Sequence, residues 1–384
     1  MGKKFTRSQK LKRETVISIT FFWGLVAIVF AVHDHLFLLA TQDQGFQHYD
    51  FTINLIATML VVPLAGVLAG GTIVYILKEE LRKLPLWAVL LLDTVIIVVL
   101  IFIISVPASL LYNSTYFQKP PWDGLVMIHS LDFLMGYGMI HTLFFWTLVA
   151  MTTMLVLQIN EKYGQGIFLK MIKGDYHRPK VETRIFMFLD IRSSTAMAER
   201  LGHVRWFELL NNFFNDITEP ILDTRGEIYQ YVGDEIIVHW STKNGLDGSN
   251  CLHCFFEISK RMEALGAKYQ AAYGVIPRFK AAVHCGNVTI GEIGKIKKDI
   301  VFTGDVLNTT ARIQELCNEY HVDLLVSQDV IERLPEASEF VIKPVGYIEL
   351  RGKQTPVSIF AVNRTDMEVS SPSVPQASKL QQKE

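Results

Sequence analysis

Hydrophobic and polar residues are distributed unevenly along the chain, and their pattern divides it into two halves. Residues 15–158 contain long apolar runs almost free of charge, whereas residues 160–384 have the mixed pattern of a water-soluble domain. A helix needs roughly 20 apolar residues to cross about 30 Å of hydrocarbon. Four runs reach that length, near 15–40, 52–77, 86–112 and 133–158. The first half is therefore predicted to be an all-α transmembrane domain of four helices.

Basic residues flank the predicted spans mainly on one side, with a single Lys in the 113–132 loop on the other, and this asymmetry predicts their orientation. Lys and Arg are frequent before the first span, between the second and third spans, and after the fourth, whereas the loop 41–50 has none. Cytoplasmic flanks carry this excess of positive charge, so we expect a multi-pass protein in the cell membrane with both termini in the cytoplasm. The expected parts are a basic N-terminus (1–14), the transmembrane domain (15–158), a cytoplasmic linker (159–183), a catalytic domain (184–363) and a disordered tail (364–384).

Four histidines lie in or beside the predicted spans. His33 and His35 are near the outer end of the first span, His129 is at the outer mouth of the fourth, and His141 lies two to three turns deeper. If the first and fourth spans are neighbours, these imidazoles could converge on a metal, a haem or a proton-sensing site. Interfacial polar residues bonded to one another or to water would give the same pattern, so this alternative stays open.

Composition narrows the class of protein. The chain has 384 residues, half of them hydrophobic, and a formal net charge of −1. These values argue against a wholly soluble enzyme, a disordered chain and a basic nucleic-acid binder. The four cysteines fit a reducing compartment rather than a disulfide framework. Cys251 and Cys254 form a CxxC within a predicted helix, and without a second such pair we interpret them as packing residues rather than metal ligands.

The second half alternates strand-like and helix-like periods. Residues 184–190 form an apolar run of strand length that ends in Asp190, and helical spacing follows from Ser194 to Asp223. Residues 227–240 have the pattern of a hairpin with Asp234 at its tip. The remaining predicted elements are a helix at 249–272, a strand–turn–strand at 278–293, a strand at 299–303, a helix at 305–320, a strand at 322–327, a short helix at 328–334 and a strand pair within 340–363.

This order of elements predicts a fold that brings two acids together. The sequence β-α-β-β-α-β points to an α+β, ferredoxin-like sheet with helices on one face. Its first and third strands are adjacent at the centre, so Asp190 and Asp234 should lie side by side at one rim. Mg²⁺ takes one or two carboxylates and leaves its other positions to phosphate and water. Such a rim suits a pair of Mg²⁺ ions bound to the phosphates of a nucleotide.

Five motifs follow one another along the second half, and together they carry a family resemblance. They are FLDIRSST (188–195), YVGDE (231–235), AVHCGNVTIGEIG (282–294), TGDVLNTTARI (303–313) and ELRGK (349–353). Over about 183–363 the chain resembles the catalytic domain of the class III nucleotidyl cyclases, the adenylyl and guanylyl cyclases. The resemblance implies a palm-type catalytic domain that cyclises a nucleoside triphosphate.

The resemblance also implies roles for individual residues. Asp190 and Asp234, helped by the backbone carbonyl of Ile191, would bind two Mg²⁺ or Mn²⁺ ions. Asn308 would orient the ribose. Arg312, four residues later and hence on the same helix face, would stabilise the charge that builds on the α-phosphate.

Two more basic residues are implied to hold phosphates. Arg351 occupies the place of a residue that holds the triphosphate, and Lys297 lies beside another phosphate contact whose aligned position is Ile296. The active site of the family forms between two catalytic domains, and this chain has one. The resemblance therefore implies a homodimer in which Asn308, Arg312 and Arg351 come from the protomer opposite the metal-binding acids.

Purine choice in this family is set mainly by two positions, which here hold Gln230 and Val301. Gln230 can donate and accept hydrogen bonds, whereas Val301 can do neither. The Glu typical of guanylyl cyclases is missing, so the favoured activity is an adenylate cyclase that converts ATP to cyclic AMP and pyrophosphate. GTP or a pyrimidine nucleotide is the alternative substrate. A membrane receptor with an inactive nucleotide-binding module is the alternative of another class, and the spans could either sense a stimulus or only anchor the enzyme in lipid.

Overall fold

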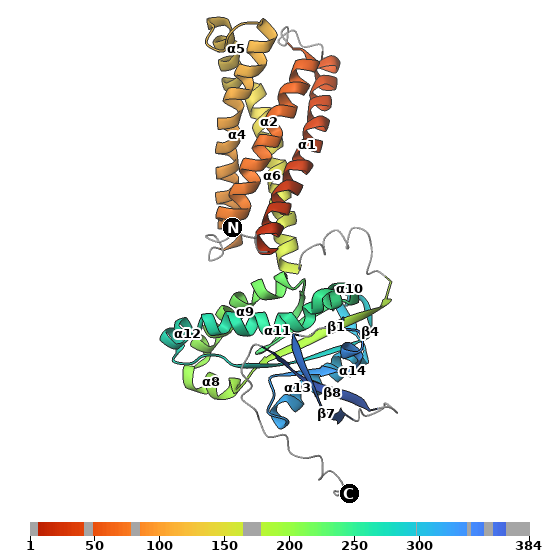
Figure 1. Cartoon of the computed structure of the whole chain (residues 1–384). Helices are drawn as coiled ribbons and strands as arrows, with labels where there is room; N and C mark the ends of the chain where they lie inside the picture. Colours follow the sequence, from red (N-terminus) through yellow and green to blue (C-terminus); the bar gives the residue numbers. More distant parts are fainter. Residues whose placement is uncertain are drawn as a thin grey trace, which may run out of the picture. The chain divides into compact units, whose positions relative to one another are not determined.

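A computed structural model of the protein describes residues 7–41, 49–77, 85–163, 178–296, 298–335, 339–348 and 356–365 (Figure 1). Within these ranges the chain forms two compact units, the first built of helices and the second of a sheet with helices. Expectations that concern Lys297, Arg351, most of the linker and the C-terminal tail lie outside the described residues.

The first unit contains the four long helices expected from the apolar runs. They are α1 (Arg7–Thr41), α2 (Phe51–Gly71) continued by the π-helical η2 (Thr72–Leu77), α4 (Leu86–Phe117) and α6 (Tyr137–Tyr163). Each is long and apolar enough to cross a membrane. Residues Gly124–Met135, which cover the end of the stretch between the third and fourth predicted spans and the first residues of the fourth, form a separate short apolar helix, α5. The carboxylate of Asp123 accepts a hydrogen bond from the backbone N–H of Leu125 at 2.9 Å, which caps this helix.

Helix α1 packs closely against both α2 and α6. A Cβ atom at Gly66 of α2 would lie 2.9 Å from the Cα atom of Thr20, so the glycine permits this close approach. Trp23 is 2% exposed, and its indole N–H donates a hydrogen bond to Oγ1 of Thr153 on α6 at 3.1 Å. The first and fourth spans are thus neighbours, which is the condition for histidines on them to converge.

The second unit is built on an eight-stranded mixed sheet. Its strands are β1 (Lys180–Ile191), β2 (Glu227–Val232), β3 (Glu235–Ser241), β4 (Phe279–Ile293), β5 (Asp299–Thr303), β6 (Leu324–Ser327), β7 (Phe340–Ile348) and β8 (Val357–Arg364). Their order is β2-β3-β1-β4-β6-β8-β7, with β5 paired to β4. Strand β1 pairs antiparallel with both β3 and β4. The expected adjacency of the first and third strands is confirmed.

Helices cover both faces of this sheet, so the expectation of helices on one face is wrong. The helices are α8 (Ser194–Leu201), α9 (His203–Asp223), α10 (Thr242–Leu246), α11 (Asn250–Ala264), α12 (Gly266–Tyr273), α13 (Asp305–Glu319) and α14 (Gln328–Ile331). Ile185, Met187 and Leu189 of β1 pack in the core with α9 and α11. Phe186 and Phe188 point the other way and pack with α13. A strand buried on both faces is apolar at consecutive positions, as this one is.

Strand β4 differs from the expected strand–turn–strand at 278–293. It is one continuous strand of 15 residues, because β1 pairs along its length while β6 and β5 pair with its two ends. Gly286, near the middle of the stretch where the turn was expected, lies inside the strand opposite Arg184. A Cβ atom there would lie 3.1 Å from the side chain of Val306, so this glycine makes room for α13.

Candidate active site

Asp190 and Asp234 lie side by side at one rim of the sheet, as the predicted topology requires. Asp190 is the next-to-last residue of β1 and stands opposite Glu235 of β3. Asp234 lies in the two-residue turn between β2 and β3, where Gly233 has φ +64°, a left-handed conformation that suits glycine. Asp234 lies close enough to Asp190 to help raise the pKa of the Asp190 carboxyl group. Ile191, the last residue of β1, is 1% exposed.

A third carboxylate, that of Glu235, lies beside the two aspartates. We call Asp190, Asp234 and Glu235 the acidic cluster, and a lysine lies next to it. Lys280 of β4 pairs with Asp190 in register, and its Nζ lies 3.4 Å from Oδ2 of Asp190. The Lys280 side chain is only 9% exposed. On the other side, the Nε2 of Gln314 from α13 donates to Oε2 of Glu235 at 3.4 Å. Strands β1, β3 and β4 and the buried face of α13 therefore position the rim.

The three carboxyl groups of the acidic cluster can carry more negative charge than the single ammonium group of Lys280 neutralises. Burial, followed by the neighbouring Asp234, raises the pKa of Asp190 to about 6, although Lys280 acts in the opposite direction. Burial, followed by the charges of Asp190 and Asp234, raises the pKa of Glu235 to about 7. Carboxylates that share a site disfavour each other's ionisation. An oxygen-rich site with surplus negative charge fits a hard divalent cation such as Mg²⁺ or Mn²⁺.

Sequence reasoning did not assign a role to Glu235, Lys280 or Gln314. Glu235 was visible only as part of the YVGDE motif, and Gln314 lies two residues after Arg312. Lys280 carried a usable signal, because a lysine inside an apolar strand is rarely buried unless it is paired. The missing information was the strand register, which aligns Asp190 with both Glu235 and Lys280.

Asn308 and Arg312 occupy the exposed side of α13. They are four residues apart and both are exposed. The buried side of the helix carries Val306, Thr309, Thr310, Ile313, Gln314 and Cys317. The residue of α13 that contacts the acidic cluster of its own chain is Gln314, not Arg312. Arg312 is thus placed where it could meet another molecule.

The two positions expected to read the base lie on neighbouring parts of β2 and β5. Gln230 is exposed and Val301 is half-buried. The residues beside them touch, because the backbone N–H of Phe302 donates to the hydroxyl of Tyr229 at 3.3 Å. Their ring centroids are 4.8 Å apart. The amide of Gln230 is therefore exposed to solvent and can form hydrogen bonds. The side chain of Val301, on the neighbouring strand β5, cannot.

The CxxC pair belongs to the core of the second unit. Cys251 and Cys254 of α11 are both 0% exposed. Burial raises the pKa of each thiol to about 12. Thiols in this state are protonated at neutral pH and are poor metal ligands. The interpretation of Cys251 and Cys254 as packing residues is confirmed.

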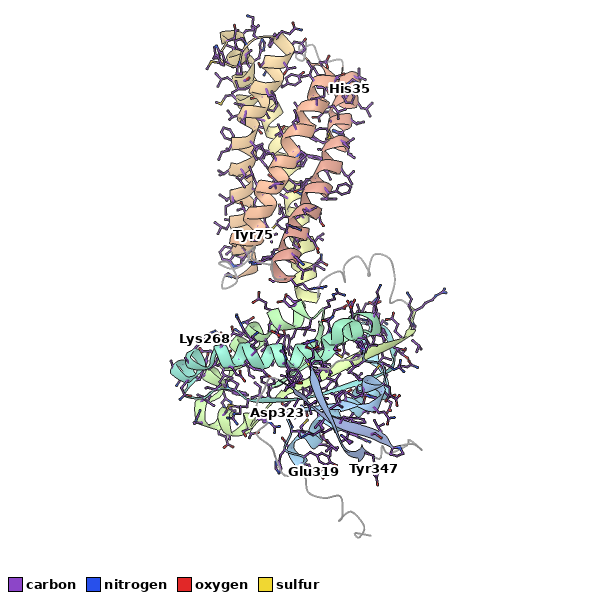
Figure 2. The ribbon with its side chains drawn as sticks, in the orientation of Figure 1. His35, Tyr75, Lys268, Glu319, Asp323 and Tyr347 are labelled. Carbon is purple, nitrogen blue, oxygen red and sulfur yellow. The ribbon has the colours of Figure 1, made fainter. Side chains whose placement is uncertain are left out.

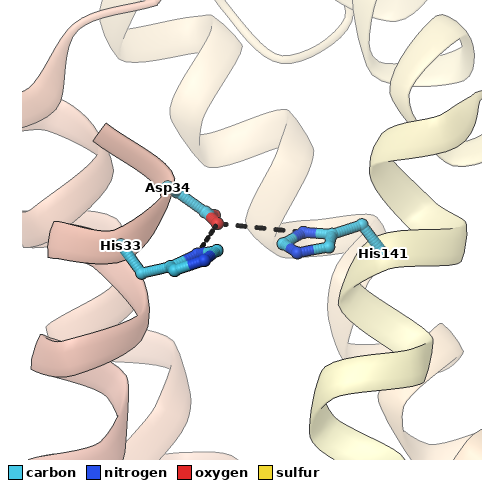
Figure 3. Close-up of side chains that lie close together, drawn as sticks. All are labelled: His33, Asp34 and His141. Carbon is cyan, nitrogen blue, oxygen red and sulfur yellow. Dashed lines mark ion pairs between the residues drawn. The ribbon is translucent and has the colours of Figure 1, made fainter. Parts of the chain in front are cut away.

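In the first unit the structure brings two of the four candidate histidines together. His33 and His141 both point to the carboxylate of Asp34 (Figure 3). His35, labelled in Figure 2, instead packs its ring 4.5 Å from that of Phe51. The ring of His129 lies 5.0 Å from that of Phe117.

Comparisons with known proteins concern mainly the second unit. Residues 177–363 match the family described as the adenylate and guanylate cyclase catalytic domain. Adenylate cyclase 2 of Rhizobium meliloti (strain 1021) is 34% identical over 207 residues, which cover 54% of this chain and 57% of that protein. The adenylate cyclase of Anabaena cylindrica is 25% identical over 183 residues, which cover 46% of this chain and 36% of that protein. The chain thus spans about a third to a little over half of these relatives' length.

Solved structures also match this part of the chain. The crystal structure of the adenylyl cyclase CyaB from P. aeruginosa is similar over 50% of this chain and 100% of that one, with 22% sequence identity and a TM-score of 0.42.

Proposed function

We propose that the protein is a membrane-anchored adenylate cyclase that converts ATP to cyclic AMP and pyrophosphate, and that residues 177–363, which match the adenylate and guanylate cyclase catalytic domain, form its catalytic part. The observation that carries this proposal is the acidic cluster at the rim of the sheet. Asp190 stands opposite Glu235, Asp234 precedes Glu235 in the adjoining turn, and the pKa values of Asp190 and Glu235 are raised to about 6 and about 7. Such a site gains stability when it binds divalent cations.

Two Mg²⁺ or Mn²⁺ ions fit this donor set. Asp190 and Asp234 would hold them through carboxylate oxygens, and the backbone carbonyl of Ile191 would add a third oxygen of the kind these cations prefer. When bound, the ions would lower the pKa of the attacking 3′-hydroxyl and neutralise the leaving phosphates. In the metal-free protein the ammonium group of Lys280, 3.4 Å from Asp190, neutralises part of the negative charge of the acidic cluster.

The chain's own residues would position the nucleotide and stabilise charge. In the reaction the 3′-hydroxyl gives its proton to a carboxylate, to water or to the substrate, and its oxygen attacks the α-phosphorus. The bond between the α-phosphorus and the oxygen that bridges to the β-phosphate breaks, and pyrophosphate leaves with the electron pair. Arg312 would donate hydrogen bonds to the non-bridging oxygens of the α-phosphate, and Asn308 would hold the ribose. Arg351 and Lys297 would add positive charge along the triphosphate.

We infer that the working unit is a homodimer with two equivalent sites. Arg312 and Asn308 face outward from α13, whereas the residue of α13 that contacts the acidic cluster of the same chain is Gln314. A twofold pair would let the α13 face of one protomer meet the acidic cluster of the other, and each site would then be complete.

ATP is the substrate that the sequence and the relatives favour. Both relatives described above are named adenylate cyclases. Gln230 is exposed and can donate to and accept from the edge of adenine, whereas Val301 makes no hydrogen bond to the base.

The four long apolar helices would anchor the enzyme in the cell membrane. The basic flanks favour an orientation with both termini and the cyclase domain in the cytoplasm.

The test is an activity assay with full-length protein in lipid nanodiscs. Protein with Mn²⁺ or Mg²⁺ is incubated separately with ATP, GTP, CTP and UTP, and cyclic nucleotide and pyrophosphate are quantified. We expect cyclic AMP from ATP, loss of activity in Asp234→Ala and full activity in Glu199→Gln, which neutralises an exposed acid of α8 in the same unit. Preference for another nucleotide would refute the assignment of the base, and no product from any of the four would refute the activity.

A further inference from the structure

A second polar cluster lies in the first unit, far along the chain from the cyclase domain. His33 and Asp34 lie near the C-terminal end of α1, and His141 lies in the second turn of α6 (Figure 3). The Nδ1 atoms of His33 and His141 are 3.5 Å and 3.8 Å from the same Asp34 oxygen, Oδ1. One ligand atom from each residue lies within 4.8 Å of the other two.

These separations fit ligands around an ion better than direct hydrogen bonds. An N–H···O bond brings nitrogen and oxygen to 2.7–3.2 Å, and both distances here are longer. A zinc-type ion binds nitrogen and carboxylate oxygen at 2.0–2.2 Å, which places neighbouring ligand atoms of a tetrahedron about 3.4 Å apart. Separations of 3.5 Å and 3.8 Å therefore leave room for an ion between the groups with small side-chain adjustments.

Packing around the cluster holds α1 and α6 together. The ring of Phe30 on α1 stacks on that of His141, with centroids 5.4 Å apart, and also lies 4.3 Å from the ring of Phe145. Farther along the contact between α1 and α6, the indole N–H of Trp23 donates a hydrogen bond to Thr153. The backbones that carry the three groups are thus fixed relative to each other, as a metal site requires.

We propose that His33, Asp34 and His141 form a binding site for a divalent transition-metal ion of the zinc class, which links α1 to α6. Two imidazoles and one carboxylate select such an ion over Mg²⁺ or Ca²⁺, which prefer oxygen ligands. Three protein ligands leave a fourth position for water or another small ligand. The side chains are 60%, 25% and 46% exposed in the order His33, Asp34, His141, so the surrounding protein does not enclose them.

The cluster differs in chemistry from the acidic cluster of the cyclase domain, and the two can be tested apart. Full-length protein, purified with a tag free of histidine, is reconstituted in nanodiscs, stripped with chelator and kept in excess Mg²⁺ to occupy oxygen-rich sites. Zn²⁺ is then titrated, and bound zinc per chain is measured by mass spectrometry. In a parallel sample Co²⁺ is added, and its visible absorption reports nitrogen ligation.

We expect one Zn²⁺ per chain in the wild type and a loss of affinity of about tenfold or more in His141→Ala and in Asp34→Asn. The matched control is His129→Ala, which removes a histidine of the same unit that packs on Phe117, and it should bind like the wild type. Asp34→Asn keeps the size of the side chain, so it gives an answer even if His141→Ala does not fold. Equal Zn²⁺ affinity in the wild type and Asp34→Asn, or an equal loss in His129→Ala, would overturn the proposal.

Discussion

Glu235 provides a direct test of the electrostatics of the acidic cluster. Its carboxyl group is partly buried, and burial together with the charges of Asp190 and Asp234 raises its pKa from 4.5 to about 7. The substitution Glu235→Gln keeps the size of the side chain and leaves an oxygen that can accept from Gln314, but it removes the charge. In metal-free protein the variant should be more stable than the wild type above pH 7.

The sign and size follow from the pKa. In the unfolded chain Glu235 loses its proton near pH 4.5, whereas in the folded protein it keeps the proton until about pH 7. The free energy of unfolding of the wild type therefore falls as pH rises from about 4.5 to about 7 and is level above that. At 1.36 kcal/mol per pH unit the full difference is about 3 kcal/mol. Because the group is half-exposed and shares its repulsion with two neighbours, we expect a gain on the order of 1–3 kcal/mol for Glu235→Gln at pH 8.

The assay is urea unfolding of full-length protein in detergent micelles with chelator present. Tryptophan fluorescence includes the transition of the second unit, whose Trp240 is fully buried. The gain of Glu235→Gln should be present at pH 8, absent at pH 4.5 and reduced by excess Mg²⁺. Glu199→Gln, which neutralises an exposed acid, is the control for charge and should change little at either pH. Equal or lower stability of Glu235→Gln at pH 8, or the same gain at both pH values, would refute this account of the cluster.

Two further substitutions test other contacts. Lys280→Gln removes the cation that lies 3.4 Å from Asp190. The free energy of unfolding should therefore fall by about 1–3 kcal/mol at pH 8 and change less at pH 5, where Asp190 and Glu235 are protonated. Urea unfolding at both pH values measures this, and an equal loss at both would contradict it. Gly66→Ala places a Cβ atom 2.9 Å from the backbone of Thr20, so it should lower the thermal stability of the first unit by about 1–3 kcal/mol in nanodiscs. The control Gly24→Ala meets nothing within 4 Å and should be neutral; equal effects of the two would refute close α1–α2 packing.

The pattern of residues was sufficient to predict the elements and the pairing of the two aspartates. Apolar runs of membrane-spanning length gave the four long helices, and the strand–helix order placed Asp190 next to Asp234. The pattern could not predict which face α13 covers, because β1 is apolar at consecutive positions and favours neither face. The turn expected around Gly286 was also wrong, since a glycine that admits a helix looks like a glycine that makes a turn.

The sequence was less informative about which side chains meet. Glu235 and Lys280 became part of the site only through the register of β1 with β3 and β4, which depends on contacts between distant segments. Likewise, four histidines near the ends of apolar helices looked equivalent. The side-by-side packing of α1 and α6 brings His33 and His141 to Asp34, whereas His35 packs on Phe51.

Complementation between two inactive variants tests the central claim, a cyclase site shared by two copies of the chain. Asp234→Ala removes the side of each site that we propose to bind metal, and Arg312→Ala removes the side that we propose to stabilise the transition state. Each variant alone should lose activity by about 100-fold or more. When the two are co-expressed in equal amounts, half of the dimers are mixed and each mixed dimer has one intact site of two, so cyclic AMP formation should return to about a quarter of the wild-type rate. Co-purified mixed dimers that remain as inactive as the single variants, or an Arg312→Ala protein that is fully active by itself, would contradict the account.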